Sequence, residues 1–170
     1  MSVIYIVEDD KNISEIESYA LKNSGYQVDS FENAKTFWSR CQERKPDLVL
    51  LDVMLPDSDR IEVLKKIRRN PDLKRVPVIM VTAKSSEIDK VKGLDNGADD
   101  YITKPFGIME LISRVKALLR RMNQDEEEKQ LTFQNIILDC EKRQVLLDGQ
   151  LCELTYKEFE LLKLFLQNAG

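Results

Sequence analysis

Residues 48–56 of this 170-residue chain read Leu48-Val49-Leu50-Leu51-Asp52-Val53-Met54-Leu55-Pro56. This stretch opens with four apolar residues in a row, a pattern typical of a strand that is covered on both faces of a parallel sheet. The apolar run stops at one carboxylate, Asp52. The stretch therefore predicts a central parallel strand that carries an acidic side chain at its carboxyl end.

Outward from this strand, short apolar runs alternate with amphipathic stretches through most of the chain. This alternation is typical of βαβ units, so we predict an α/β fold with an open, doubly wound parallel sheet of five strands in the order 2-1-3-4-5. The predicted strands cover residues 3–7, 26–31, 48–51, 76–81 and 101–102, and the predicted helices cover residues 11–23, 34–42, 61–69, 87–96 and 108–122. Four apolar residues of the first helix share one face: Ile13, Ile16, Tyr19 and Ala20. Gly25 is expected to end that helix.

The composition changes towards the end of the chain. Residues 123–130 are polar or charged throughout, which predicts a linker. Beyond it, Asp148-Gly149 is a strong hairpin signal, and Thr155 with Glu158 matches a capping box in front of an apolar helix. Short strands are predicted at residues 136–138, 145–147 and 151–154. We therefore divide the chain into a first domain (1–122), a linker (123–130) and a second domain (131–170).

Polar side chains follow the ends of four predicted strands: Glu8, Asp9, Asp52, Thr82 and Lys104. In an open parallel sheet, ligands bind beyond the carboxyl ends of the strands, so these side chains are expected to converge. Neighbouring carboxylates repel one another unless a hard cation binds between them, and Mg²⁺ is the expected ion. A carboxylate can attack phosphorus to form an acyl phosphate. We therefore expect Asp52 to accept a phosphoryl group that Lys104 and Thr82 stabilise.

The composition excludes several classes of function. The chain has no histidine, which removes most hydrolase triads, and its three cysteines fit neither a disulfide framework nor a zinc site. No apolar run reaches the length of a membrane span, so a cytoplasmic protein is expected. Residues 123–170 carry five basic and ten acidic groups and lack the basic surface that DNA binding uses.

Four motifs together resemble the receiver domain of two-component response regulators of the OmpR/PhoB type. They are Val7-Glu8-Asp9-Asp10, Leu50-Leu51-Asp52-Val53-Met54-Leu55-Pro56, Val81-Thr82-Ala83 and Gly97-Ala98-Asp99-Asp100-Tyr101-Ile102-Thr103-Lys104-Pro105-Phe106. The resemblance covers residues 2–121 and implies a flavodoxin-like fold, with Asp52 phosphorylated by a sensor histidine kinase. It also implies a Mg²⁺ site formed by Glu8, Asp9, Asp52 and the main-chain carbonyl of Met54.

The resemblance assigns further roles. Thr82 and Lys104 would contact the phosphoryl group, and Lys104-Pro105 would be a cis peptide. Thr82 and Tyr101 would act as the switch, with a half-buried strand aromatic as the alternative role of Tyr101. The subfamily usually has glycine where Arg60 stands, and a left-handed backbone there would cost arginine about 1 kcal/mol.

The resemblance also implies a homodimer through the fourth helix, fifth strand and fifth helix. Its expected ion pairs are Lys90 with Glu110, Asp100 with Arg114, and Asp99 with Arg121. We expect phosphorylation to promote this dimer. Exposed pairs contribute only about 0 to 1 kcal/mol each, so ordinary solvated faces remain an alternative.

Residues 131–170 resemble the start of the winged-helix effector domain of the same subfamily. The recognition helix is not among the 170 residues, so we expect promoter DNA to be a partner of the full-length parent alone. An adaptor receiver that signals by protein contact is an alternative function. An aspartyl-phosphate phosphatase requires a second Asp two residues after the nucleophile, where this chain has Met54. A dinucleotide-binding enzyme requires a glycine-rich loop after the first strand, where this chain has acidic residues. Both classes are therefore disfavoured. We expect no enzymatic activity apart from Mg²⁺-dependent self-phosphorylation and autodephosphorylation.

Overall fold

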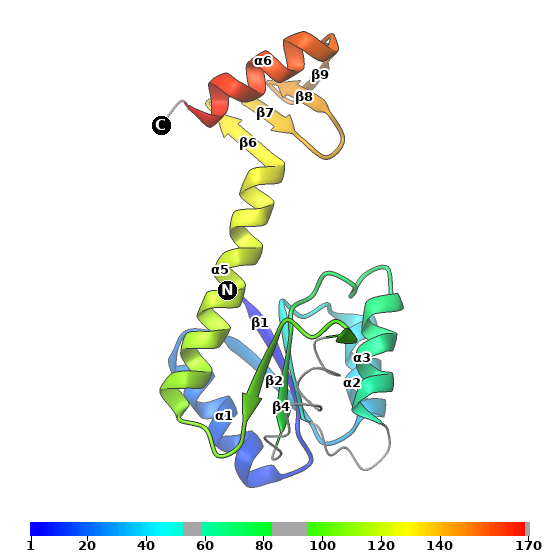
Figure 1. Cartoon of the computed structure of the whole chain (residues 1–170), viewed down its shortest axis with the longest axis vertical. Coiled ribbons are helices and arrows are strands. Elements are labelled where there is room, and N and C mark those ends of the chain that lie inside the picture. Colours follow the sequence, from blue (N-terminus) through cyan, green and yellow to red (C-terminus); the bar gives the residue numbers. More distant parts are fainter. Residues whose placement is uncertain (53–58, 83–94, 169–170) are drawn as a thin grey trace. The chain divides into compact units, whose positions relative to one another are not determined.

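The computed structural model describes residues 1–52, 59–82 and 95–168 (Figure 1). The chain forms two compact units, Met1–Leu119 and Arg120–Gly170. Three sequence predictions fall outside the described residues: the fourth helix over most of its length, the metal-binding carbonyl of Met54, and the dimer residue Lys90. None of the helices within the described ranges is long and apolar enough to cross a membrane.

The first unit contains a five-stranded parallel sheet with the order β2-β1-β3-β4-β5, which confirms the predicted order. Its strands are β1 (Val3–Val7), β2 (Gln27–Phe31), β3 (Leu48–Asp52), β4 (Val78–Thr82) and β5 (Asp100–Thr103). β1 and β3 are direct neighbours, with Val7 opposite Leu51. The residues that follow these two strands therefore meet at one edge of the sheet.

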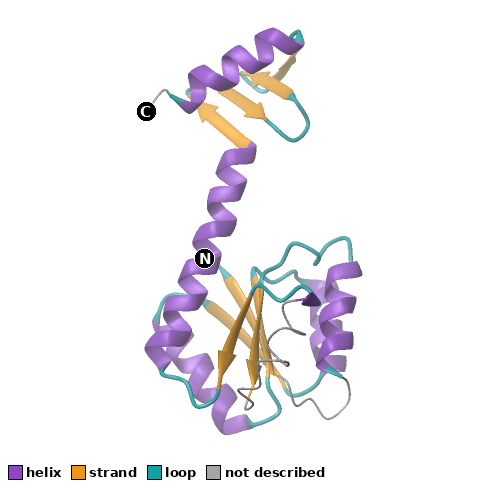
Figure 2. Cartoon of the chain, viewed as in Figure 1, coloured by secondary structure: helices purple, strands orange, loops and turns teal. Residues whose placement is uncertain are grey.

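Helices cover both faces of this sheet (Figure 2). α1 (Lys11–Asn23) and α5 (Ile108–Lys129) lie on one face, and α2 (Ala34–Glu43) and α3 (Arg60–Arg69) lie on the other. Successive side chains of a strand point to opposite faces of the sheet, so alternate residues of β1 belong to two hydrophobic cores, one on each face. Tyr5 packs with Phe37 of α2, and Ile6 packs with Leu111 of α5. This burial on both faces explains the continuous apolar runs of the strands.

α1 begins and ends as its sequence predicts, but it buries a different face. The Asp10 side chain accepts hydrogen bonds from the first turn, and Gly25 follows the helix with φ +92°. On the predicted apolar face, however, Ile16 is 57% exposed and Tyr19 is 71% exposed. The buried residues are Ser14, Glu17 and Leu21. Apolar residues stand on more than one side of this helix, so periodicity alone does not choose the side that meets the sheet.

Two local predictions about the backbone need correction. β4 begins at Val78 rather than Val76, because the Val76 N–H bonds to the Leu73 carbonyl in a turn and Pro77 has no N–H to donate. Arg60 is the first residue of α3, which the Asp59 side chain caps. Its backbone is helical, so the cost expected for a left-handed arginine does not arise.

The polar segment predicted to be a linker is helical over most of its length. α5 continues to Lys129, seven residues beyond its predicted end at Met122, and β6 (Gln130–Phe133) follows directly. Residues 123–129 contain no glycine or proline, and five of the seven are good helix formers: one glutamine, three glutamates and one lysine. A polar segment that contains no glycine or proline can therefore continue a helix rather than end it.

The second unit combines an antiparallel sheet, in the order β6-β7-β8-β9, with one helix. The remaining elements are β7 (Ile136–Asp139), β8 (Gln144–Leu147), β9 (Gln150–Cys152) and α6 (Tyr156–Gln167). The hairpin at Asp148-Gly149 is confirmed, with φ of 52° and 78°, and so is the capping box of Thr155 and Glu158. α6 crosses one face of the sheet (Figure 2), and Phe159 packs there on Leu138 and Val145.

Candidate functional site

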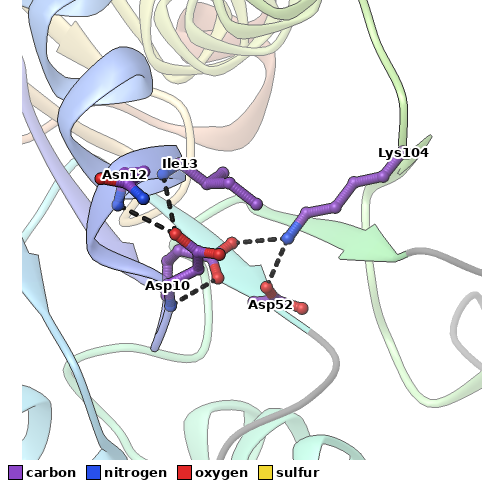
Figure 3. A network of polar contacts seen from close by, with 6 residues as sticks. Asp10, Asn12, Ile13, Asp52 and Lys104 are labelled. Carbon is purple, nitrogen blue, oxygen red and sulfur yellow. Dashed lines mark hydrogen bonds and ion pairs between the residues drawn. The ribbon is translucent and has the colours of Figure 1, made fainter.

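Three side chains from separate strands meet at the carboxyl edge of the parallel sheet. Glu8 follows β1, Asp52 is the last residue of β3, and Lys104 follows β5. The Lys104 Nζ lies 2.7 Å from Glu8 Oε2 and 2.7 Å from Asp52 Oδ2, and Figure 3 shows Lys104 reaching over to Asp52. The predicted convergence of these residues is therefore present in the structure.

Glu8 is held firmly in this cluster. Its side chain is 2% exposed, its main-chain N–H donates to the Phe31 carbonyl, and its Oε1 accepts a hydrogen bond from the Asp10 N–H. Burial, with a smaller contribution from the neighbouring Asp52, raises the pKa of Glu8 to about 8, although Lys104 opposes this rise. The pocket therefore favours a bound proton or cation beside Glu8.

Lys104 supplies the positive charge of the pocket. Burial disfavours its ammonium form, but the hydrogen bonds to Asp52 and Glu8 outweigh burial and raise the pKa of Lys104. The Lys104 N–H also donates to the Thr82 carbonyl at 2.6 Å, which ties the chain after β5 to the end of β4. Lys104-Pro105 is a cis peptide, as the sequence predicts. The ammonium group is thus charged at neutral pH and lies beside the Asp52 carboxylate.

The carboxylates also fit a divalent cation. One carboxylate oxygen from each of Glu8, Asp9 and Asp52 lies within 4.8 Å of the others. Glu8 and Asp52 are buried whereas Asp9 is exposed, so the cluster opens to solvent on one side. Clustered carboxylate oxygens with room for water suit a hard ion such as Mg²⁺.

The two predicted switch residues lie in β4 and β5. Thr82 is fully buried at the end of β4, opposite Thr103, and Asp52 pairs with Val81 in the adjacent register. Tyr101 is half-buried and packs on the core beside α2 and α3. Its hydroxyl is buried and has no hydrogen-bond partner in the part of the chain that the structure describes. Tyr101 thus combines a packed ring with an unsatisfied hydroxyl.

The charges of the expected dimer surface pair within the protomer. Arg114 Nη1 lies 2.9 Å from Asp100 Oδ1, and Arg114 Nη2 lies 3.0 Å from Glu110 Oε1. Arg121 is exposed. Asp99 pairs with Arg68 at 2.7 Å and also accepts the Val78 N–H at 2.8 Å. These contacts order the surface but do not test the predicted dimer.

The sequence analysis did not identify two further residues, Arg68 and Glu17, whose contacts or burial are unusual for charged side chains. Arg68 donates to three main-chain carbonyls, those of Gly97, Lys74 and Val76, in addition to its pair with Asp99. Glu17 is 2% exposed, and burial raises its pKa to about 7, with Lys104 lowering it and Asp52 raising it further. Both look like ordinary surface charges in the sequence. Glu17 follows Ser14 by three residues and so lies on the same face of α1. Its burial could be inferred from the sequence only if that face were already known to be the buried one.

Comparison with known proteins gives consistent matches. Residues 4–116 match the family model of the response regulator receiver domain. The chain is 40% identical over 163 residues to the phosphate regulon transcriptional regulatory protein PhoB of Pseudomonas aeruginosa, covering 96% of this chain and 71% of that protein. It is 40% identical over 168 residues to the response regulator ArlR of Staphylococcus saprophyticus, covering 99% and 74%.

A solved structure matches over both units. The response regulator DrrB of Thermotoga maritima, described as an OmpR/PhoB homolog, is 36% identical with a TM-score of 0.65, and the match covers 100% of this chain and 74% of that one. The family model covers the sheet and the acidic cluster, and the relatives extend over the second unit as well. The chain therefore belongs to the response regulator receiver family and is a two-component response regulator of the OmpR/PhoB type.

Proposed function

We propose that a sensor histidine kinase phosphorylates this chain on Asp52, in the cytoplasm, and that phosphorylation controls dimerisation and transcription by the complete regulator. The observation that carries the proposal is the position of Asp52. Asp52 is the last residue of a buried strand, its side chain is 5% exposed, and its Oδ2 lies 2.7 Å from the ammonium of Lys104. A cation beside a buried carboxyl group favours its charged form and fixes its position, as a nucleophile towards phosphorus requires.

The transfer needs little proton chemistry. An oxygen of Asp52 attacks phosphorus and forms an O–P bond while the bond from phosphorus to the donor breaks, a P–N bond in phosphohistidine or a P–O bond in acetyl phosphate. The nucleophile is a carboxylate oxygen rather than a hydroxyl, so no general base is required. Lys104 would then pair with the new phosphoryl oxygens, and the Thr82 hydroxyl would donate a hydrogen bond to them. Water would later attack phosphorus, break the O–P bond to Asp52 and release inorganic phosphate, which restores the Asp52 carboxylate.

A divalent cation would complete the pocket. We propose Glu8, Asp9, Asp52 and the Met54 carbonyl as the residues that hold Mg²⁺. The close approach of the three carboxylates supports this set. When bound, Mg²⁺ supplies positive charge that lets an anionic phosphoryl group approach the acidic cluster. Apart from self-phosphorylation and autodephosphorylation, we propose no reaction for this protein.

The proposal extends to the response. Thr82 and Tyr101 would shift on phosphorylation and favour a homodimer through the surface that contains Asp100 and Arg114. The intramolecular pair between these residues would be exchanged for the same pair across a two-fold axis, where every contact occurs twice. Residues 1–122 would form the receiver domain, residues 123–130 the connection, and residues 131–170 part of the effector domain that binds promoter DNA in the complete protein.

Transcriptional control is favoured over an adaptor role by the extent of the similarity. A free-standing receiver would share only its first unit with relatives, whereas the match to a protein named as a transcriptional regulator covers 96% of this chain. A chain that dimerises but never affects transcription when fused to its remaining domain would favour the adaptor role instead.

Phosphorylation is tested by intact mass spectrometry after incubation with acetyl phosphate and Mg²⁺. We expect one added phosphate on the wild type and none when EDTA replaces Mg²⁺. Asp52→Asn should take up none, whereas Asp29→Asn, which changes a carboxylate outside the pocket, should behave as the wild type. Phosphate uptake by Asp52→Asn at the wild-type rate would refute the proposal.

Dimerisation is tested separately by sedimentation velocity with beryllofluoride as the phosphoryl analogue. We expect the analogue to shift the wild type from monomer to dimer, and Arg114→Ala to weaken that shift. An unchanged sedimentation coefficient with the analogue bound would exclude the proposed dimer without affecting the assignment of Asp52.

A further inference from the structure

Arg68 is a cation of α3 that holds one residue of the expected dimer surface. Its guanidinium donates hydrogen bonds to three main-chain carbonyls, those of Gly97, Lys74 and Val76, at 2.8, 3.2 and 2.6 Å. These three bonds fix the position of the guanidinium. Its Nη2 lies 2.7 Å from Asp99 Oδ2, so a fixed cation pairs with this acid within the protomer.

Asp99 itself is held at two points. The same Oδ2 accepts a hydrogen bond from the Val78 N–H at 2.8 Å, and the Asp99 N–H donates to the Val78 carbonyl at 2.9 Å. The Asp99 side chain is nevertheless 38% exposed, against 21% for Arg68. Asp99 therefore remains at the surface directly before β5, with its charge compensated from inside by Arg68.

The next acid, Asp100, has a different kind of partner. Arg114, 2.9 Å away, lies on α5 and belongs to the expected dimer surface itself. In a two-fold dimer this pair can be exchanged for the same pair between the two copies, so neither charge loses its partner. Arg68 lies on α3, outside that surface. A contact between Asp99 and Arg121 of a second copy therefore either removes the carboxylate from Arg68 or places two guanidinium groups on one carboxylate.

Both arrangements weaken the contact. If Asp99 leaves Arg68, one ion pair is lost within the protomer for each pair that is gained across the interface. If Asp99 stays, its negative charge is shared and two positive charges approach each other. A two-fold dimer contains the contact twice, so the cost also occurs twice.

We propose that Arg68 restrains dimerisation by holding Asp99 in an ion pair within the protomer. Arg68 sets how tightly the phosphorylated chain dimerises, and it touches neither the phosphorylation pocket nor the second copy. This inference rests on the proposed function, because it concerns the dimer expected there. It adds α3 to the elements that control the dimer surface.

Three variants distinguish competition for Asp99 from support of the fold. Arg68→Met removes the charge but keeps an unbranched side chain beside Gly97, whereas Arg68→Lys keeps a positive charge. Arg69→Met changes an exposed arginine of the same helix and is the matched control. If Arg68 only supported the fold, its loss would destabilise the chain and weaken the dimer. If Arg68 competes for Asp99, its loss strengthens the dimer even though the chain is less stable.

The experiment measures the dimer dissociation constant by sedimentation equilibrium with beryllofluoride and Mg²⁺, at a temperature at which circular dichroism shows every variant folded. We expect the constant of Arg68→Met to be about three- to tenfold below that of the wild type, as for two exposed ion pairs. Arg68→Lys and Arg69→Met should stay within about twofold of the wild type. In an Arg121→Ala background, Arg68→Met should have no effect, because Asp99 then has no cation to gain across the interface.

The outcomes separate this role from the proposed function. If the wild type and Arg68→Met both remain monomeric with the analogue bound, the proposed dimer and the role of Arg68 both fail. If the wild type dimerises and Arg68→Met dimerises equally or more weakly, the dimer stands and the role of Arg68 is refuted. The role is refuted equally if Arg68→Met strengthens the dimer by the same factor without Arg121, or if Arg68→Lys strengthens it as much as Arg68→Met.

Discussion

Replacing Glu17 with glutamine should remove a pH-dependent loss of stability. Burial raises the pKa of Glu17 from 4.5 to about 7, so the folded chain holds this proton more tightly than the unfolded chain. The resulting stabilisation is fully present below the unfolded pKa and disappears as the pH rises through the folded pKa. Between about pH 5 and about pH 8, linkage gives a loss of about 2 to 3 kcal/mol in the free energy of unfolding.

The assay is urea unfolding in EDTA at several values between about pH 5 and about pH 8, with the free energy of unfolding compared at each value. Glu8 also has a raised pKa and titrates in this range, but it is present in both proteins and cancels in the difference. We expect the stability of Glu17→Gln relative to the wild type to increase by about 2 to 3 kcal/mol across the range. Glu15→Gln should show no such increase. A pH-independent difference would refute the electrostatic description of Glu17.

Three further predictions follow from the same structure. Lys104→Ala leaves Glu8 and Asp52 without the cation they share. In EDTA at neutral pH, the lost hydrogen bonds between charged groups should lower the free energy of unfolding by about 2 to 3 kcal/mol. Added Mg²⁺ should recover more stability in this variant than in the wild type, and equal recovery would contradict the prediction. Arg68→Ala removes bonds to three carbonyls and to Asp99 and should cost about 2 to 4 kcal/mol in urea unfolding, against about 0.5 kcal/mol or less for the exposed Arg69→Ala. Phe159→Ala should remove amide-exchange protection from β7 and β8 but leave β1 and β3 protected, because Phe159 belongs to the core of the second unit. Loss of protection in both units would show that the division into two units is wrong.

The sheet and the main pocket could be predicted from the sequence for one physical reason. A parallel strand that is buried on both faces must be apolar along its whole length, so the end of each strand is visible where the first polar residue appears. Asp52 and Thr82 mark such ends, and parallel topology brings them to the same edge. The positions of Glu8 and Asp52 follow from this rule without any knowledge of distances.

The sequence was less informative where two packing choices are equally compatible with the pattern. α1 carries apolar side chains on both its buried and its exposed face, and only the sheet decides that Glu17 faces inward while Tyr19 faces solvent. Arg68 reads as a surface charge because its carbonyl partners, such as that of Gly97, are distant in sequence. The end of α5 was misjudged because a polar composition was taken as a break, whereas only a residue with poor helix propensity would have ended it.

The central claim is that Asp52 is the residue that receives the phosphoryl group. The most direct measurement is peptide mapping by mass spectrometry, after the chain has reacted with acetyl phosphate and Mg²⁺ and the acyl phosphate has been trapped by borohydride reduction. We expect the trapped modification at Asp52 and no modification of Glu8 or Asp9. A modification at another carboxylate, with Asp52 unmodified, would contradict it.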